Sequence, residues 1–557
     1  MYFSQRILII ALPVLLMMPM VKADENNYVS KVWVADKGDG TYQNPVLNAD
    51  YSDPDVCQAG KDYYLTASSF NCVPGLPILH SRDLVNWEII GYALQKLPPF
   101  AVFDKPQHGK GVWAPCIKYH SKTFYIYWGD PDFGIYMVKT KNVAGPWSEP
   151  VLVKAGKGLI DPSMLWDDDG KVYLSHAFAG SRIGLNSIVV VQEMNSEGTK
   201  VISPEVMIVD GNVGGNHTVE GTKLYKRNGY YYMLSPAGGV KQGWQIAARS
   251  RNIYGPYEVK IVMAQGNTDI NGPHQGGLVE TSSGESWFLH FQDNTVYGRV
   301  LHLNPVHWIN DWPVMGVDSD GDGCGEPVRN YRKPDVGKTY PIETPAESDE
   351  FNDTKLGLQW SWHANPQVGW AFSNPYGYLR LYSVYLPENH INLWDVPNLL
   401  LQKLPGEEFS ATTKVKLRSR EGMDQVGVVV MGYDYSYLSL KFDSGKFVLE
   451  QVTCENSIES TPEKVVASVS FEPDNTFTIP SNSFEKEVYL RINIRKMGLC
   501  SFEYSVDGQQ FQPLGETFRF SQGKWIGAKV GLFCVAPPRE VSGKDKGWAD
   551  VDWFRIE

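Results

Sequence analysis

The stretch NGYYYMLSP (228–236) joins a tight turn to a run of aromatic and aliphatic residues, which predicts the second strand of a β-hairpin. Four other segments repeat this pattern: GKDYYLTAS (60–68), SKTFYIYWG (121–129), DGKVYLSHA (169–177) and GESWFLHFQ (284–292). Their aligned positions, Tyr63, Phe124, Val172, Tyr230 and Trp287, are separated by 61, 48, 58 and 57 residues. A recurrence this regular indicates one structural unit repeated five times.

A second element follows three of the five segments and ends in a closing aromatic residue. Its copies are HSRDLVNWE (80–88), KTKNVAGPWSE (139–149) and RSRNIYGPYEV (249–259). A hairpin followed by further strands at this period is typical of propeller blades. The 312 residues from 24 to 335 give about 62 residues per blade, enough for four strands and their loops. We therefore predict a five-bladed β-propeller; the alternative, an irregular β-sandwich, would not repeat its hairpins so regularly.

The composition favours an all-β protein of more than one domain. The chain has 557 residues, 13% of them aromatic, with 52 Gly and 35 Pro. Its formal net charge of −12 and lack of a basic block argue against nucleic acid as a partner. Disorder and coiled coil are excluded by 43% hydrophobic and 20% charged residues. Aromatic residues also suit a ligand with apolar faces, such as a sugar ring, although most serve the core.

The N-terminus predicts a signal peptide, residues 1–23. Arg6 precedes an apolar run of 14 residues, 7–20, which is too short to span a bilayer comfortably. Val21-Lys22-Ala23 places small residues where cleavage before Asp24 needs them. We expect an exported protein, periplasmic or secreted, with no membrane association after cleavage; a membrane anchor is the alternative.

The cysteines do not predict a disulfide framework. Seven is an odd and sparse number for an exported protein of this length, and no two cysteines form a metal-type CxxC pair. We expect most of them to be buried as small apolar residues.

Five residues lie 10 to 13 positions before the aligned hairpin strands, where the innermost strand of each blade should begin. They are Asp53, Trp113, Asp161, Glu220 and His274. Equivalent positions in five blades converge at one end of the central channel, so we expect these side chains to lie together. Carboxylates gathered at a buried site repel one another and raise at least one pKa, which suits acid–base chemistry.

Paired carboxylates without a nucleophilic Ser or Cys motif point to glycoside hydrolysis. One carboxylic acid would protonate the leaving oxygen, a second would activate water, and a third would tune the acid. The alternative is that one or more of these acids binds a cation or caps a turn, because Asp-Pro at 53–54 and 161–162 is also an ordinary turn initiator.

Five blocks of the first half resemble the motifs of family 43 glycoside hydrolases. They are NPVLNADYSDPDV (44–56), GVWAP (111–115), IDPSMLWDDDGKVYL (160–174), VEGTKLYKRNGYYYML (219–234) and GRVLHLNPVHWINDWPV (298–314), all in the family's order. That family comprises five-bladed propeller β-xylosidases, α-L-arabinofuranosidases and arabinanases, and it inverts the anomeric configuration.

The resemblance implies a role for each matched position. Asp53 is expected to be the general base, Glu220 the general acid, and Asp161 the residue that orients the acid and modulates its pKa. Arg299 would hydrogen-bond the sugar, and His274 would lie at the channel centre, near which some members hold Ca²⁺. No cofactor is expected to be required, although Ca²⁺ is allowed.

One segment of the first blade departs from the common xylosidase pattern. Many family xylosidases carry an aromatic cluster before a Pro-Gly pair, whereas this chain has SSFNCVPGLPILHS (68–81). The segment resembles a subgroup with both xylosidases and arabinofuranosidases, which leaves the sugar preference open. Trp113 and Phe70 are candidates for packing on the sugar; ordinary propeller core is the alternative.

Three aspartates in VDSDGDGCGEPV (317–328) imitate the first half of a calcium loop. Asp318, Asp320 and Asp322 have the spacing, but the twelfth position is Arg329 rather than Glu, so the full EF-hand pattern fails. A tight polar turn is the preferred interpretation and a surface Ca²⁺ the alternative.

The second half predicts a β-sandwich. After a Pro-containing linker, residues 331–346, strands alternate with period two in FSATTKVKL (409–417), VGVVVMGYDYSYLSLKF (426–442), KFVLEQVTC (446–454), VYLRINIRK (488–496) and GAKVGLFCV (527–535). Residues 347–557 resemble the concanavalin-A-like jelly-roll domain of family 43 xylosidases, through DEFN, YSVDG and GWADVDWFRIE. There the domain packs on the propeller and can lend a loop to the pocket; an independent carbohydrate-binding module is the alternative.

The expected protein is therefore a propeller (24–330) and a sandwich (347–557) that together form an exo-acting, inverting glycosidase. Its substrates would be terminal β-D-xylosyl or α-L-arabinofuranosyl residues of plant cell-wall glycans or their oligosaccharides. Alternatives are a non-catalytic lectin, an arabinan-degrading endo-enzyme, and a retaining fructan-hydrolysing propeller. The last usually has Asn-Asp-Pro-Asn-Gly where this chain has Ser52-Asp53-Pro54-Asp55.

Overall fold

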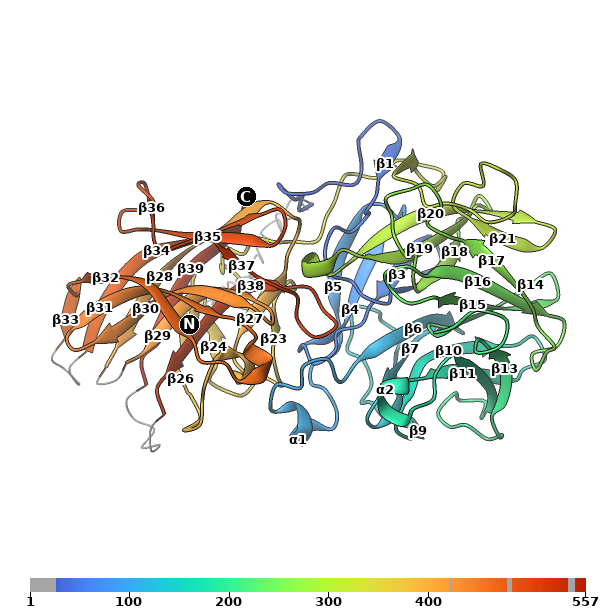
Figure 1. The fold of residues 1–557 in the computed structure, drawn as a ribbon, viewed down its shortest axis with the longest axis horizontal. Coiled ribbons are helices and arrows are strands. Elements are labelled where there is room, and N and C mark those ends of the chain that lie inside the picture. The colour runs from blue at the N-terminus through green and yellow to red at the C-terminus, as the bar shows by residue number, and fades with distance from the viewer. Residues whose placement is uncertain (1–26, 421–422, 478–482, 539–545) are drawn as a thin grey trace, which may run out of the picture.

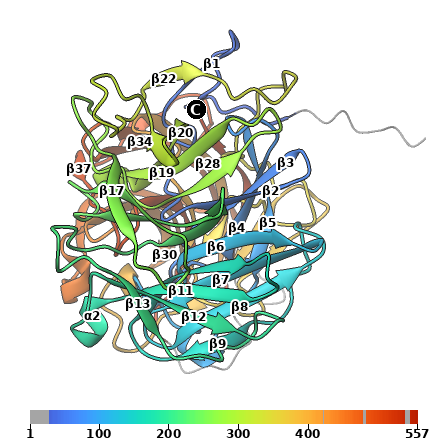
Figure 2. The same cartoon turned by 90° about the vertical axis from the view of Figure 1, so that its right-hand side faces the viewer.

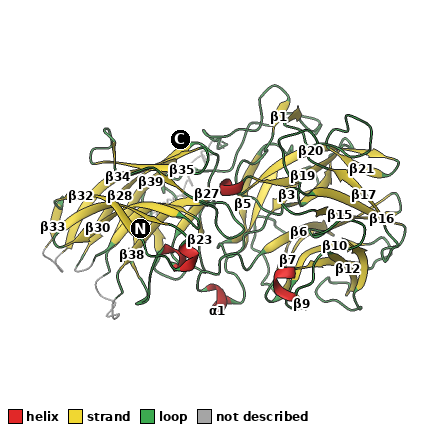
Figure 3. Ribbon diagram, viewed as in Figure 1, coloured by secondary structure: helices red, strands yellow, loops and turns green. Residues whose placement is uncertain are grey.

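The computed structural model describes residues 27–420, 423–477, 483–538 and 546–557, so the predicted signal peptide lies outside it. The described chain is almost entirely β-structure arranged in two bodies side by side (Figures 1 and 3). Its few helical turns are α1 (Phe100–Phe103), α2 (Gly180–Ile183), η1 (Thr295–Tyr297), η2 (Leu393–Asp395) and η3 (Ser457–Glu459). None of the helices in these ranges has the length and apolarity to span a membrane.

The first body is a five-bladed propeller, as predicted, with four antiparallel strands in each blade. Blade 1 contains β2 (Asp55–Ala59), β3 (Asp62–Thr66), β4 (Gly75–Ser81) and β5 (Trp87–Leu94). Blade 2 contains β6 (Trp113–His120), β7 (Thr123–Asp130), β8 (Gly134–Thr140) and β9 (Val151–Ala155). Blade 3 contains β10 (Leu159–Trp166), β11 (Val172–Phe178), β12 (Ile188–Met194) and β13 (Val206–Asp210). Blade 4 contains β14 (Lys223–Arg227), β15 (Tyr230–Ala237), β16 (Trp244–Ser250) and β17 (Glu258–Met263). Blade 5 contains β18 (Gly276–Glu280), β19 (Ser286–Asp293), β20 (Arg299–Ile309) and β21 (Trp312–Met315).

The five repeated segments form the second strand of each blade, β3, β7, β11, β15 and β19, each paired with the strand before it. The first strands of neighbouring blades contact one another, β2 with β6 and β18, and β10 with β6 and β14, so they surround the centre (Figure 2). The prediction that the strand before each repeat is the innermost one is confirmed.

Residues 44–51 close the ring by pairing with the first half of β20. Leu47 and Leu301 exchange main-chain hydrogen bonds of 3.4 and 3.0 Å. The fully buried Asn44 amide donates to the Leu303 and Val328 carbonyls and accepts from the Leu303 N–H, each at 2.8 Å. The segment before blade 1 is thereby joined to the last blade.

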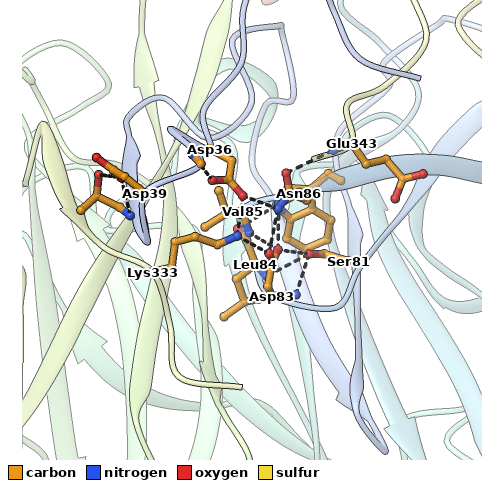
Figure 4. A network of polar contacts seen from close by, with 12 residues as sticks. Asp36, Asp39, Ser81, Asp83, Leu84, Val85, Asn86, Lys333 and Glu343 are labelled. Carbon is orange, nitrogen blue, oxygen red and sulfur yellow. Dashed lines mark hydrogen bonds and ion pairs between the residues drawn. The ribbon is translucent and has the colours of Figure 1, made fainter. Parts of the chain in front are cut away.

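The segment predicted as a linker lies against the propeller. After β22 (Asn330–Arg332), which pairs with β1 (Thr41–Gln43), Lys333 forms ion pairs with the buried carboxylates of Asp36 and Asp83 at 2.5 and 2.7 Å. Figure 4 shows how Asn86 links these two acids and accepts a hydrogen bond from the Glu343 N–H. The segment is therefore fastened to blade 1 and to the N-terminal residues.

The second body is the predicted two-sheet sandwich. One sheet contains β23 (Ser361–Trp362), β26 (Val384–Tyr385), β27 (Leu400–Lys403), β29 (Gln425–Met431), β30 (Tyr435–Asp443), β31 (Lys446–Cys454), β32 (Lys464–Phe471) and β38 (Lys529–Ala536). The other contains β24 (Ala371–Ser373), β25 (Leu379–Tyr382), β28 (Phe409–Ser419), β33 (Asn475–Phe477), β34 (Ser483–Arg495), β35 (Leu499–Ser505), β36 (Gln512–Pro513), β37 (Phe518–Arg519) and β39 (Trp548–Ile556). Every second residue of β28 is buried, which gives the alternation seen in the sequence, and the core lies between the sheets. Residues 426–442, predicted as one long strand, form two strands because the chain turns at 432–434 between β29 and β30.

The sandwich packs directly on the propeller, where it contacts blade 1, the segment between blades 1 and 2, and blade 5. Val73 and Trp362 exchange main-chain hydrogen bonds of 3.0 and 2.6 Å across the domain boundary. The His108 ring stacks on Trp394 with 3.7 Å between centroids, and its Nε2 lies 2.6 Å from the Trp394 carbonyl oxygen.

Six of the seven cysteines are buried, as expected, and all seven are free thiols.

Candidate functional site

The five residues predicted to converge all lie at the start of a first strand. Asp53 and His274 precede β2 and β18 by two residues, and Glu220 precedes β14 by three. Trp113 opens β6, and Asp161 is the third residue of β10. Five blades thus contribute one residue each to the same end of the channel.

The main chain changes direction at these positions. Asp53 and Asp161 have φ values of 51° and 56°, and Ala114 and Gly221 beside Trp113 and Glu220 have 38° and 62°. Such left-handed conformations are uncommon for residues other than glycine and concentrate at functional sites. β-bulges accompany them in β6 and β10, where the register shifts beside Trp113 and Asp161.

The Asp53 carboxylate is held by three donors. Ser52 Oγ and Ser68 Oγ donate to its Oδ2 at 2.9 and 2.7 Å. Arg299 Nη1 donates to its Oδ1 at 3.1 Å and to Ser52 Oγ at 2.6 Å. Ser68 Oγ also accepts from the Ala114 N–H at 2.7 Å, which ties the acid of blade 1 to blade 2. Donors to an ionised carboxylate stabilise the charged form that a general base needs.

Asp161 is 4% exposed and accepts a 2.7 Å hydrogen bond on Oδ2 from the Gly221 N–H, which follows Glu220. Burial and the nearby charge of Asp53 raise the pKa of Asp161 to about 7, although the hydrogen bond from Gly221 opposes the shift. The Lys223 and Arg299 cations also lower this pKa. The Asp161 carboxylate is therefore placed to fix the main chain that carries Glu220.

The pKa of Glu220 is also raised. Burial, and then the charges of Asp161 and Asp53, raise its pKa to about 8, with Arg299 opposing. Glu220 therefore holds a proton at neutral pH, which is the state a general acid needs.

Lys223 is a buried cation near the acids. Its side chain is fully buried, and Nζ donates to the Pro115 carbonyl at 2.9 Å. A buried ammonium is costly unless its charge is used, and here it opposes the protonation of Asp161.

His274 is 2% exposed, and neither ring nitrogen has a hydrogen-bond partner among the described residues. Burial, with Arg299 and His290 adding to it, lowers the pKa of His274 to about 3, so the ring is neutral. A neutral imidazole can face a cation or a water molecule, but Ca²⁺ prefers oxygen ligands. Within the described ranges no metal-type group of three His, Cys, Asp or Glu includes His274. The protein side chains alone therefore do not provide a Ca²⁺ cage there.

Three aromatic side chains stand in a row beside the acids. Phe70 and Trp113 meet edge-on with centroids 6.2 Å apart, and Trp113 meets Trp525 of the sandwich at 6.1 Å. Phe70 is 3% exposed, whereas Trp525 is 44% exposed. Trp525 and Arg299 line one cavity of about 190 Å³, together with the loops at 240–241, 293–295 and 522–526. The sandwich thus supplies one wall of the site.

The aspartates of the calcium-like loop do come together. Asp318, Asp320 and Asp322 present carboxylate oxygens within 4.8 Å of one another, and their side chains accept main-chain hydrogen bonds within the loop. Such bonds are those of a polar turn, which was the preferred interpretation.

Sequence reasoning missed four residues of the site. Ser52 and Ser68 hold Asp53, Lys223 is the buried cation, and Trp525 comes from the other domain. Ser52 is next to Asp53 in the sequence, and Lys223 lies in the motif that contains Glu220. The sequence therefore placed both residues near the site without indicating what they do. No periodicity connects residue 525 with residue 113.

The comparisons with known proteins agree with this geometry. The family model described as glycosyl hydrolases family 43 matches residues 42–313, and that of the β-xylosidase C-terminal concanavalin A-like domain matches residues 348–557. A β-xylosidase of Formosa agariphila is 33% identical, covering 94% of this chain and 91% of its own. A non-reducing end α-L-arabinofuranosidase of Bacteroides ovatus is 30% identical, covering 72% and 75%. The crystal structure of a xylan β-1,4-xylosidase from Bacillus halodurans has a TM-score of 0.78 at 26% identity, covering 92% and 99%. This chain therefore belongs to glycoside hydrolase family 43 and is a glycosidase.

Proposed function

We propose that this enzyme removes terminal β-D-xylosyl or α-L-arabinofuranosyl residues from plant cell-wall glycans or their oligosaccharides. The observation that carries the proposal is the meeting of Asp53, Asp161 and Glu220, where Arg299 contacts Asp53 and also lines a cavity together with Trp525. The relatives named β-xylosidase and α-L-arabinofuranosidase support both sugars and do not separate them.

Each acid has a distinct step in this proposal. Glu220 gives its proton to the leaving oxygen as the bond from that oxygen to the anomeric carbon breaks. Asp53 takes a proton from the water molecule that attacks the same carbon from the opposite face. Asp161 holds the Gly221 N–H and, as a nearby negative charge, keeps the Glu220 proton in place.

Attack on chain ends is supported by the relative named a non-reducing end α-L-arabinofuranosidase and by the sandwich loop beside Arg299. The cavity lined by Arg299 and Trp525 has a volume of about 190 Å³, which is below the roughly 300–1,000 Å³ of sites for drug-sized ligands. An endo-acting arabinanase needs a groove open at both ends, whereas here the sandwich loop 522–526 lines the cavity next to Arg299. A non-catalytic lectin would have no use for a carboxylic acid with a pKa of about 8.

Initial rates on an aryl β-D-xyloside and an aryl α-L-arabinofuranoside test the substrate assignment. The wild type should cleave at least one of them, and D53A and E220A should lose most activity on the preferred natural glycan. Full activity of either variant on that glycan would disprove its assigned role.

We also propose that hydrolysis inverts the anomeric configuration, as the family resemblance implies. Proton NMR of the first turnover products distinguishes the outcomes. A β-xyloside should yield α-xylose before mutarotation, and initial release of β-xylose would contradict the proposal.

We propose that catalysis needs no metal, because carboxyl groups supply both proton transfers. Prior dialysis against a chelator should leave kcat/KM unchanged within about twofold. Calcium at Asp318, Asp320 and Asp322 would then affect thermal stability alone.

Export is proposed from the N-terminal sequence. The apolar run at 7–20 and the small residues before Asp24 support cleavage by a signal peptidase. N-terminal sequencing of the protein from its native host should begin at Asp24, whereas a start at Met1 would contradict export by this route.

A further inference from the structure

Asp50 is a buried carboxylate at the boundary between the two domains. It lies three residues before Asp53, in the segment that closes the propeller ring, and is 3% exposed. Its Oδ1 accepts a 2.9 Å hydrogen bond from the Arg299 N–H, and its Oδ2 accepts a 3.0 Å bond from the Gly527 N–H. One carboxylate therefore joins blade 5 to the sandwich.

The two residues whose N–H groups bind Asp50, Arg299 and Gly527, belong to the site or lie next to it in the sequence. Arg299 is itself the residue whose guanidinium holds Asp53. Gly527 follows Trp525 by two residues, and the Ala528 N–H beyond it donates to the Val296 carbonyl at 2.7 Å. Any displacement of Asp50 would therefore move the wall of the pocket and the main chain of Arg299 together.

The contact around Asp50 leaves no space for a side chain at Gly298 or at Gly527. A Cβ on Gly298 would lie 2.5 Å from the Asp50 carboxyl carbon, and one on Gly527 would lie 2.6 Å from the Gly298 nitrogen. Two glycines thus allow two main chains to reach one carboxylate.

A carboxylate is needed because both approaching groups are N–H donors. An asparagine in the same place could accept with one oxygen only and would turn its own NH₂ toward the other donor. Loss of one bond to a charged acceptor, with a donor left buried, is a substantial penalty.

We propose that Asp50 is a positioning residue of this glycosidase, which holds the Trp525 loop of the sandwich over the pocket in register with Arg299. The active site then depends on both domains through one side chain that touches no substrate. The proposal rests on the glycosidase activity and on a contact of Trp525 with the sugar.

A double-mutant cycle tests this role. Kinetic constants are measured for wild type, D50N, W525A and the double variant on whichever aryl glycoside the wild type prefers. D50N should lower kcat/KM by about 10-fold, mainly through KM, because a hydrogen bond to a charged group is lost. The double variant should be little worse than the worse single variant, since W525A removes what Asp50 positions.

D349N is the matched control, because Asp349 accepts main-chain hydrogen bonds from Phe351 and Gly357 within the sandwich. It should lower the melting temperature without changing KM. Additive effects of D50N and W525A, or a D50N enzyme with wild-type KM, would overturn the proposal. If D50N does not fold, D50E, which displaces the charge by one methylene, enters the same cycle with the same expectations.

A wild type that cleaves neither aryl glycoside would instead refute the proposed function. A failure of the Asp50 proposal can therefore be distinguished from a failure of the proposed function.

Discussion

Three carboxyl groups in one site differ because their surroundings differ. Asp53 has three donors around it, Asp161 has one main-chain donor and two nearby cations, and the Glu220 carboxyl has no hydrogen-bond donor among the described residues. Burial with few donors favours the protonated form, and burial with many donors favours the charged form. The raised pKa of Glu220 fits its proposed role as the general acid.

The pH dependence of kcat/KM should reflect the Glu220 proton. The acid acts when protonated, so activity is retained below its pKa and falls as the pH rises through about 8. Rates measured on a natural oligosaccharide across this range would check the expectation. An alkaline limb below pH 6 would show that a different group carries the proton.

The leaving group should separate the two catalytic acids. E220Q should lose about 100-fold or more on an oligosaccharide but retain much more activity on an aryl glycoside whose phenol is acidic, because such a phenolate leaves without protonation. D53N should be impaired on both substrates, since water must be activated in either case. Equal losses in E220Q on the two substrates would contradict the role of Glu220.

At the scale of elements, the hairpin strands were predictable because their pattern is local. A turn followed by an aromatic-rich run needs only nine residues, and it marks β3, β7, β11, β15 and β19. The long run at 426–442 was mistaken for one strand because both β29 and β30 are buried along most of their length, which hides the turn between them.

The buried Asn44 amide contributes to ring closure beside the main-chain bonds, so N44A should destabilise the propeller. The substitution removes the side-chain partner of the Leu303 N–H and of the Val328 carbonyl, at about 1–3 kcal/mol for a buried group, whereas the Leu303 carbonyl keeps the Tyr42 hydroxyl at 2.8 Å. Scanning calorimetry should show a melting temperature lower by several degrees. The exposed Asn475 provides the control, and N475A should melt like the wild type. An unchanged transition in N44A would show that the main-chain bonds suffice, namely those between Leu47 and Leu301 and the 2.9 Å bond from the Tyr51 N–H to the Arg299 carbonyl.

At the scale of the whole molecule, the site is larger than the propeller that carries its acids. Asp53, Asp161 and Glu220 could be located from the sequence because each blade repeats the same strand start. Trp525 could not be located in this way, because its place depends on how the sandwich packs against the propeller. No local sequence pattern encodes that contact. The net charge of −12 gave no guide either, since three acids among 63 carry the proposed chemistry.

The domain interface should therefore influence catalysis, and Asn365 offers a test remote from the acids. This sandwich residue is 1% exposed; its Oδ1 accepts from the Leu97 N–H at 2.8 Å, and its Nδ2 donates to the Leu97 and Phe100 carbonyls at 3.1 and 3.3 Å. N365A should loosen the contact of the sandwich with the Leu97–Phe100 segment, so that KM rises several-fold while kcat changes less. Steady-state kinetics with N352A, an exposed asparagine of the same domain, as control would check this. Wild-type kinetics in an N365A protein of lowered melting temperature would show that the sandwich stabilises the propeller without shaping its pocket.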